Sequence, residues 1–139
     1  MTKKHSIFIE WGDTDAAGIV FFPNFYKWMD ESTHALFREM GLSTAYLMKE
    51  KNIGLPILEA HCEFISALYF EDSVVVETQL EVLKPKVIKL NHRFTCEGKI
   101  VAEGYTVRCW TSFGDVPKAI RMPQQIEDLL IQNGLLAAK

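Results

Sequence analysis

Two carboxylates, Asp13 and Asp15, lie in a short run of small residues that ends at Gly18. Glycine allows the backbone to approach a bound molecule closely, so a ligand could come within reach of either carboxylate. A carboxylate can attack a carbonyl carbon directly to give an anhydride, or it can activate a water molecule for the same attack. The pattern favours hydrolysis of a carbonyl compound such as a thioester, and the sequence leaves both routes open.

A helix is predicted to begin a few residues after this loop, where the sequence reads VFFPNFYKW. Pro23 suits the first helical position, because the N–H that proline lacks would be unpaired there in any case. The first turn of a helix has unpaired N–H groups and a partial positive charge, which favour a bound anion. The amides around Phe22 and Asn24 are therefore candidate oxyanion donors, and Asp15 could face the same carbonyl carbon.

The same residues have simpler structural interpretations. On residue type alone, Asp15 in a glycine-containing loop is more often a turn or cap residue, and Asp13 is expected to form the loop rather than to act as a second catalyst. The aromatic residues nearby are more often core than acyl pocket, so we expect Trp28 in the core and Phe22 near the substrate. Asp30 and Glu31 lie farther inside the helix, and for them the expectation is surface pairing, of Glu31 with Lys27.

Hydrophobic spacing predicts the elements that must position these residues. Helices are expected over residues 24–40, with Gly41 as a stop, and over 43–51 and 123–130. Alternating apolar and polar residues predict strands over residues 6–11, 58–68, 74–82, 88–96 and 99–113. One strand, one long helix and then a meander of four strands describe an α+β fold, in which an antiparallel sheet of about five strands wraps around a central helix.

The composition is that of one ordinary globular domain. Of the 139 residues, 48% are hydrophobic and 24% are charged, and no repeat or linker divides the chain, so residues 1–139 are predicted to form a single domain. The net charge of -3 gives no electrostatic reason to expect a nucleic-acid partner. We also expect no membrane association and a cytoplasmic location, because no apolar run has the length of a membrane span or a signal peptide core.

The three cysteines, Cys62, Cys96 and Cys109, are too widely spaced for a CxxC motif. We expect three buried thiols in a reducing compartment. None of the four histidines has the spacing of a metal site or a catalytic triad, so they are expected to be structural. The sequence therefore predicts neither a metal site nor a cofactor.

The segment DTDAAGIVFFPNFYKWMDE resembles the active-site segment of hotdog-fold acyl-CoA thioesterases of the 4-hydroxybenzoyl-CoA thioesterase type, and the resemblance extends over almost the whole chain. It implies a hotdog fold and the hydrolysis of a small aryl or short-chain acyl-CoA to a carboxylic acid and free CoA. It also implies that Asp15, the second Asp of the D-x-D pair, is the catalytic carboxylate, and that the Phe22 N–H is the oxyanion donor.

The resemblance further implies substrate contacts and an assembly. Other substrate-binding residues are expected at Gly18, Ile19, Val20, Pro23 and Asn24, and at Leu55 and Pro56 just before the long strand. Lys84 and Lys86 fall where family members contact the phosphates of CoA, although Pro85 stands in place of a third basic residue. Family members pair their sheets edge to edge, with active sites at the subunit interface, so a homodimer or homotetramer is expected.

Two other functions fit the same fold. A hotdog dehydratase or hydratase needs a histidine paired with an acidic residue at the start of the helix, and residues 11–26 contain no histidine. A non-catalytic acyl-CoA-binding module would form persistent complexes with thioesters and release no free thiol.

Overall fold

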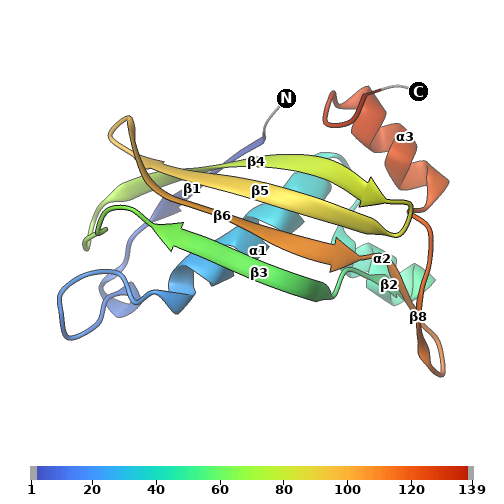
Figure 1. The fold of residues 1–139 in the computed structure, drawn as a ribbon, viewed down its shortest axis with the longest axis horizontal. Helices are drawn as coiled ribbons and strands as arrows, with labels where there is room; N and C mark the ends of the chain where they lie inside the picture. The colour runs from blue at the N-terminus through green and yellow to red at the C-terminus, as the bar shows by residue number, and fades with distance from the viewer. Residues whose placement is uncertain (1–2, 138–139) are drawn as a thin grey trace.

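The computed structural model describes residues 3–137 and shows an antiparallel sheet curved around one long helix (Figure 1). The sheet has five strands in the order β1-β4-β5-β6-β3. Their bounds are β1 (Lys3–Phe8), β3 (Ile57–Phe64), β4 (Ser73–Lys84), β5 (Val87–Cys96) and β6 (Lys99–Cys109). The helix α1 (Pro23–Glu39) lies against one face of this sheet. The predicted α+β architecture is confirmed.

Smaller elements complete the fold at its two ends. They are the 3₁₀ turn η1 (Trp11–Asp13), the helices α2 (Thr44–Lys51) and α3 (Gln124–Gln132), and the short strands β2 (Ile53–Gly54), β7 (Thr111–Phe113) and β8 (Pro117–Ala119). The three short strands form a second sheet in the order β2-β7-β8, which the sequence patterns did not predict. The two shorter helices match the predictions to within two residues at each end.

The predicted strand over residues 99–113 is divided at Trp110. The Trp110 side chain is fully buried. The backbone N–H of Trp110 donates to the Lys86 carbonyl at 2.9 Å, and the Trp110 carbonyl accepts the Ile120 N–H at 2.8 Å. The chain therefore changes strand partners at this residue, and β7 continues in the small sheet instead of the large one.

Two other predicted strands are too long. The first ends at Phe8, and Trp11 lies in the turn η1 with its side chain 73% exposed. The strand predicted over residues 58–68 ends at Phe64, because the N–H groups of Ile65 and Ser66 both donate to the Val101 carbonyl and the chain then leaves the sheet. Residues 65–72 form a loop instead, and this loop becomes part of the candidate site.

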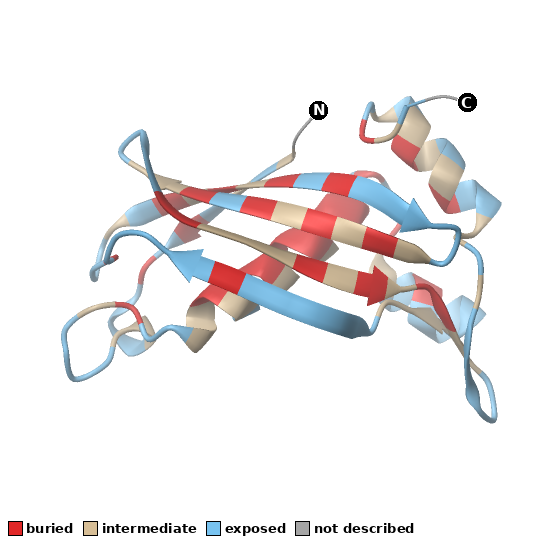
Figure 2. Ribbon diagram, in the orientation of Figure 1, coloured by how far each residue is buried: buried red, intermediate tan, exposed pale blue. Residues whose placement is uncertain are grey.

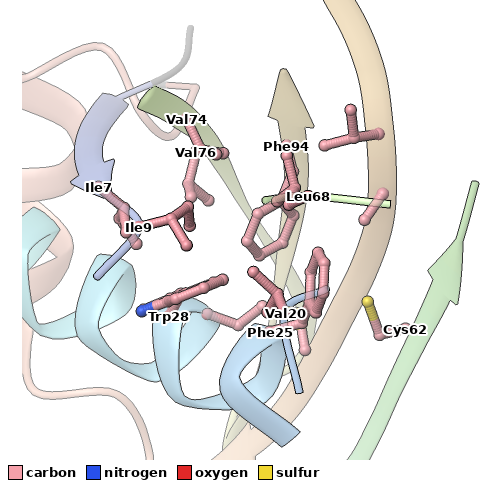
Figure 3. Close-up of a cluster of buried hydrophobic side chains, with 13 residues drawn as sticks. Ile7, Ile9, Val20, Phe25, Trp28, Cys62, Leu68, Val74, Val76 and Phe94 are labelled. Atoms are coloured by element: carbon pink, nitrogen blue, oxygen red, sulfur yellow. The ribbon is translucent and has the colours of Figure 1, made fainter. Parts of the chain in front are cut away.

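Two hydrophobic clusters fill the space between the sheet and the helices. The first lies under the N-terminal half of α1 and includes Phe25, Trp28 and Phe94 (Figure 3). The second lies under the C-terminal half of α1 and is covered by α3, with Phe37 and Trp110 at its centre. Figure 2 shows the burial of α1 and the contrasting exposure of β3, which forms an edge of the sheet. Trp28 lies in the core as predicted.

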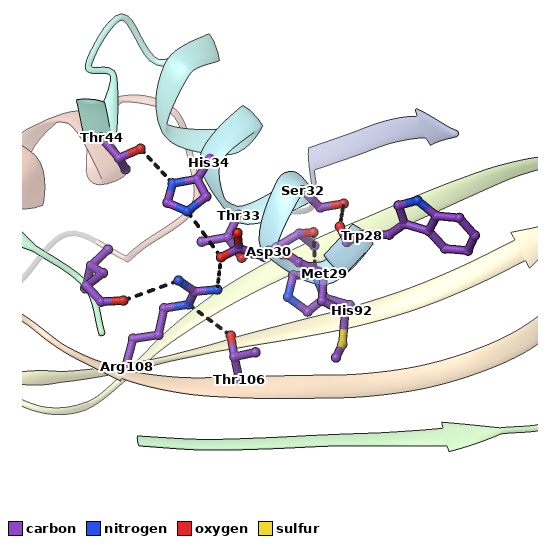
Figure 4. Close-up of polar contacts among 12 residues, drawn as sticks. Trp28, Met29, Asp30, Ser32, Thr33, His34, Thr44, His92, Thr106 and Arg108 are labelled. Carbon is purple, nitrogen blue, oxygen red and sulfur yellow. Dashed lines mark hydrogen bonds and ion pairs between the residues drawn. The ribbon is translucent and has the colours of Figure 1, made fainter. Parts of the chain in front are cut away.

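A polar cross-link separates the two clusters (Figure 4). The buried Arg108 of β6 donates to Asp30 of α1 at 2.9 Å, and the same carboxylate oxygen lies 3.2 Å from Nε2 of His34. The other ring nitrogen of His34 lies 2.6 Å from the Thr44 hydroxyl, which links α1 to α2. Hydrogen bonds from His34 and Arg108 hold the pKa of Asp30 at about 2, although burial opposes this shift.

The acidic residues within α1 therefore behave in two ways. Glu31 lies 3.9 Å from Lys27 on the helix surface, as predicted. Asp30 instead pairs with Arg108, whose side chain is 3% exposed. The expectation of surface pairing is wrong for Asp30, because its partner lies on a strand 78 residues away and no local pattern indicates that contact.

The cysteines are less uniform than expected. Cys62 is buried, and burial raises the pKa of its thiol to about 11, whereas Cys96 and Cys109 are half-buried. Within residues 3–137, no cluster of three or more His, Cys, Asp and Glu side chains is arranged to hold a metal ion. In the same range, every helix is too short or too polar to cross a membrane.

Candidate functional site

Asp15 lies at the start of a tight hairpin loop. Thr14 and Val20 pair as an antiparallel bridge, and the Asp15 N–H donates to the Ile19 carbonyl at 3.0 Å. The loop closes through Gly18, whose N–H donates to the Asp15 carbonyl at 2.9 Å and whose φ of 81° is a conformation that suits glycine. Asp15 is thereby held at the exposed end of the loop.

The Asp15 carboxylate supports this turn with one of its oxygens. Oδ1 accepts the Ala17 N–H at 2.9 Å, which is the turn-forming contact that the residue type alone suggests. Among the described residues, Oδ2 accepts no hydrogen bond, so one carboxylate oxygen is available to a substrate or a water molecule.

Asp13 and Asn24 fasten the loop to the start of α1. The Asp13 carbonyl accepts two hydrogen bonds, from the Phe21 N–H at 2.9 Å and from Nδ2 of Asn24 at 2.8 Å. The Asp13 carboxylate accepts the Glu10 N–H at 2.9 Å, in keeping with its predicted role as a loop-former. The side-chain N–H of Asn24 is thus engaged within the protein, which makes Asn24 a residue that positions the site.

The first turn of α1 leaves one amide without a partner. The Phe21 N–H is bonded to Asp13, and the N–H groups of Asn24 and Phe25 donate to the carbonyls of Phe21 and Phe22 at 3.0 and 3.1 Å. Pro23 has no N–H to donate. Among the described residues, the Phe22 N–H donates to no protein acceptor. The helix N-terminus therefore presents this amide, with the partial positive charge of the helix dipole behind it.

Phe22, the residue that carries this amide, lines a hollow of about 330 Å³. One wall comes from the loop and α1, with Ile19, Val20, Phe22 and Phe25, and the other from residues 64–68. Its aromatic rings pack edge to face, with the Phe64 centroid 5.1 Å from that of Phe25 and 6.2 Å from that of Phe22. The hollow is the kind of apolar site that binds a small acyl group.

The remaining predicted binding residues lie at the other end of the sheet. The Leu55 carbonyl accepts a hydrogen bond from Arg108 at 3.3 Å, and the Pro56 carbonyl accepts the Cys109 N–H at 3.2 Å. Lys84 ends β4 and Lys86 lies in the turn before β5. The 12 residues of β4 separate this end from the loop by about 40 Å at roughly 3.3 Å per residue (Figure 1).

Two parts of these sites were missed in the sequence. The wall formed by residues 64–68 continues the alternating pattern of a strand, so the pattern gave no sign of a loop. Arg121 lies just before α3 and lines a second hollow of about 300 Å³ together with Lys84. The Met122 N–H donates to the Pro85 carbonyl at 3.0 Å, and this bond brings Arg121 beside the β4–β5 turn.

Comparison with known proteins settles the family. The sequence profile of the thioesterase-like superfamily matches residues 9–130. This chain belongs to the thioesterase-like superfamily. A 4-hydroxybenzoyl-CoA thioesterase from Pseudomonas sp. strain CBS-3 is 30% identical over 86 residues, which span 60% of this chain and 61% of that enzyme, less than two thirds of its length.

Solved structures agree with this assignment over more of the chain. A gentisyl-coenzyme A thioesterase is 41% identical with a TM-score of 0.83, covering 90% of this chain and 99% of that one. An Asp-to-Asn mutant of 4-hydroxybenzoyl CoA thioesterase, complexed with 4-hydroxybenzoyl CoA, is 25% identical with a TM-score of 0.85 and covers 92% of this chain and 97% of that one. The predicted hotdog fold and the predicted class of enzyme, a thioester hydrolase, are confirmed.

Proposed function

We propose that this protein hydrolyses a small aryl-CoA thioester, with the Phe22 N–H as oxyanion donor and Asp15 as the catalytic carboxylate. The observation that carries the proposal is the unpartnered Phe22 amide beside an aromatic hollow. When the thioester carbonyl is attacked, its oxygen becomes an anion, and a fixed N–H at a helix N-terminus stabilises that charge.

Asp15 supplies the attack in one of two ways. Its free oxygen can add to the thioester carbon, after which the C–S bond breaks, CoA leaves as a thiolate and water hydrolyses the resulting anhydride. Alternatively, Asp15 removes a proton from water, and the hydroxide adds to the same carbon before the C–S bond breaks. In a single turnover in heavy-oxygen water, only the anhydride route can place the heavy oxygen in the Asp15 side chain.

The acyl hollow supports an aryl substrate. A cavity of about 150 Å³ lined by Leu, Ile and Phe binds a benzene ring, so a hollow of about 330 Å³ has room for a substituted ring. The edge-to-face rings of Phe22, Phe25 and Phe64 offer the geometry that aromatic groups prefer. The two thioesterases of known structure are named for gentisyl-CoA and 4-hydroxybenzoyl-CoA, which are aryl thioesters as well.

The phosphates of CoA would bind to basic residues of a neighbouring subunit. These residues lie at the other end of the sheet. Lys84 and Arg121 line one hollow there, with Lys86 two residues along the turn, so Arg121 supplies the basic group that Pro85 does not. Two chains paired antiparallel along their β3 edges would place the start of one β3 beside the end of the other. This homodimer would bring the basic residues of one chain toward Asp15 of its partner.

A thiol-release assay tests the proposed reaction. The purified protein is mixed with benzoyl-, hydroxybenzoyl-, phenylacetyl- and short-chain acyl-CoAs, and free CoA is measured with a thiol reagent. We expect release of free thiol and the matching acid, fastest with the benzoyl and hydroxybenzoyl thioesters. Persistent complexes without thiol release would instead support a binding module, and addition of water to an enoyl-CoA would support a hydratase. Either result would overturn the proposal.

A further inference from the structure

The acyl hollow has a single polar side chain. Eight of its nine lining residues, Ile19, Val20, Phe22, Phe25, Phe64, Ile65, Ala67 and Leu68, have apolar side chains, and the ninth is Ser66. Ser66 lies on the loop that follows β3, opposite the wall that contains Phe22. A serine hydroxyl can donate one hydrogen bond and accept others, so Ser66 is the one side chain of this lining that can hydrogen-bond a ligand.

Three backbone groups of this wall are bonded within the protein. The N–H groups of Ile65 and Ser66 both donate to the Val101 carbonyl, at 2.9 and 3.0 Å. The Leu68 carbonyl accepts the Val20 N–H at 2.8 Å, which closes the hollow between its two walls. The Ser66 hydroxyl itself makes no hydrogen bond to any described residue. The backbone bonds therefore fix the position of Ser66 and leave its hydroxyl free.

The position of Ser66 relative to the reacting carbonyl determines what it can contact. The thioester oxygen would bind the Phe22 N–H on one wall, and the ring would extend from that carbonyl into the space beside Phe64 and Phe25. A hydrogen-bonding group on the facing wall can then contact a substituent on the ring, while the aromatic side chains contact its faces and edges.

From this arrangement we propose that the Ser66 hydroxyl is the specificity-determining group of the acyl site, and that it binds a hydroxyl substituent on the aryl ring of the substrate. The inference rests on the proposed aryl-CoA hydrolysis and deepens it. It assigns a preference for a hydroxybenzoyl over an unsubstituted benzoyl thioester to one side chain. A neutral hydrogen bond contributes about 1 kcal/mol, so the preference should be roughly two- to tenfold in kcat/KM.

The test compares variants that differ only in the hydroxyl. Ser66→Thr keeps a hydroxyl, and Ser66→Val has the shape of the threonine side chain without the hydroxyl. Ser66→Ala removes the hydroxyl with the least change in volume. For each protein, kcat/KM is measured with benzoyl-CoA and with the 2-, 3- and 4-hydroxybenzoyl-CoAs. The ratio of hydroxybenzoyl to benzoyl is the readout, because the benzoyl rate corrects each variant for changes in folding or concentration.

We expect the wild-type protein and Ser66→Thr to prefer at least one hydroxybenzoyl-CoA, and Ser66→Ala and Ser66→Val to lose that preference while still hydrolysing benzoyl-CoA. Equal ratios in all four proteins, or a wild-type protein without any preference, would overturn the inference while leaving aryl-CoA hydrolysis in place. Absence of thiol release from every aryl-CoA with the wild-type protein would instead overturn the proposed function itself, and the inference with it.

Discussion

At the start of α1, the Phe22 N–H is the one amide without an acceptor among the described residues. The Phe21 N–H and the Asn24 side chain both donate to the Asp13 carbonyl, and Pro23 has no N–H. These two hydrogen bonds connect the start of α1 to the loop on either side of Phe22. At this scale the proposed site consists of a backbone donor, the Phe22 N–H, and a carboxylate, Asp15, whose Oδ1 accepts the Ala17 N–H. Its activity should depend on the Phe22 N–H more than on the Phe22 ring.

Replacing Phe22 with proline tests this dependence. Proline removes the N–H, and the φ of -55° at this position is one that proline adopts readily. We expect Phe22→Pro to lower kcat by about 10²- to 10³-fold, the usual cost of removing an oxyanion donor. Phe22→Ala keeps the N–H and removes only the ring, so the effect of this variant should be mainly a higher KM. Similar kcat values for the two variants would show that the amide is not the donor.

At the scale of elements, α1 must lie close to the sheet for the loop and the helix start to meet. At Gly104 of β6 the packing leaves no room for a side chain, since an added Cβ would lie 2.5 Å from the His61 carbonyl oxygen of β3 and 2.7 Å from the Met29 sulfur of α1. The cross-link from Arg108 to Asp30 also joins β6 to α1, at the helix residue that follows Met29. Both contacts join residues that are distant in the chain.

Gly104→Ala should destabilise the protein through this close approach. Because one of the colliding atoms belongs to the backbone, the strand or the helix must move, at a cost of about 1 to 3 kcal/mol in the free energy of unfolding. Gly114→Ala is the matched control, since a Cβ there would meet no atom within 4 Å. Urea denaturation measures both, and equal stabilities would contradict the packing described for α1.

His92 makes the stability of the fold depend on pH. Burial lowers the pKa of His92 from 6.5 to about 3, so the ring is neutral in the folded protein, with Nδ1 lying 2.9 Å from the Thr78 hydroxyl. The unfolded chain binds a proton below pH 6.5 and the folded chain does not. The contribution of His92 is therefore fully present above pH 6.5 and is lost as the pH falls from 6.5 toward 3.

His92→Asn should remove this dependence, because asparagine can keep a hydrogen bond to Thr78 and does not titrate. Between pH 7 and pH 4.5, the wild-type free energy of unfolding should fall by about 2 to 3 kcal/mol more than that of the variant. This range stays above the window in which Asp30 titrates. Parallel pH profiles for the two proteins would mean that His92 is not a buried neutral group.

Local signals made α1 and its turns predictable. The helical period, Pro23 at the start and Gly41 at the end delimit α1 to within one residue. Glu97 and Gly98 adopt positive φ in the turn between the strands predicted over residues 88–96 and 99–113. The same period-two pattern that located the strands extended β3 too far. β3 ends where the N–H groups of Ile65 and Ser66 both donate to the Val101 carbonyl. Val101 belongs to β6, which is distant in the sequence, so no local pattern indicates this end.

The candidate site was predictable in part for the same reason. Asp15, Phe22 and the nearby binding residues lie in one contiguous segment, and that segment carries the family resemblance. The Arg108–Asp30 pair and the approach of Arg121 to Lys84 join residues that no local period connects. Such contacts follow from the register of strands and helices in space, so they require the structure.

At the scale of the whole molecule, the five-stranded sheet has two edges, β1 and β3, and β3 is the more exposed of the two. β3 pairs only with β6 among the described strands and is exposed along most of its length (Figure 2). Leu58 on this strand is 61% exposed. A long, exposed edge strand offers unpaired backbone N–H and C=O groups to another strand. A two-fold dimer through this edge would combine Asp15 of one chain with Lys84 and Lys86 of the other, and it predicts complementation between inactive variants.

Mixing two inactive variants tests this arrangement. Asp15→Asn is unfolded and refolded together with Lys84→Ala/Lys86→Ala. In a mixed dimer, one site receives both defects and the other receives none, so random pairing should restore about a quarter of the wild-type activity. The restored activity is measured by thiol release at a low concentration of acyl-CoA. Activity no higher than the mean of the separate variants would contradict a site shared between subunits.

The most direct test of the central claim is the effect of Asp15→Asn on hydrolysis of the best aryl-CoA substrate. Asparagine keeps the oxygen that accepts the Ala17 N–H, so the loop should persist while the charge and the nucleophile are lost. Asp115→Asn, in an exposed loop, is the matched control. We predict that Asp15→Asn lowers kcat by at least about 10³-fold with unchanged thermal stability and that the control stays near the wild-type rate. A folded Asp15→Asn protein with near wild-type kcat would contradict the account.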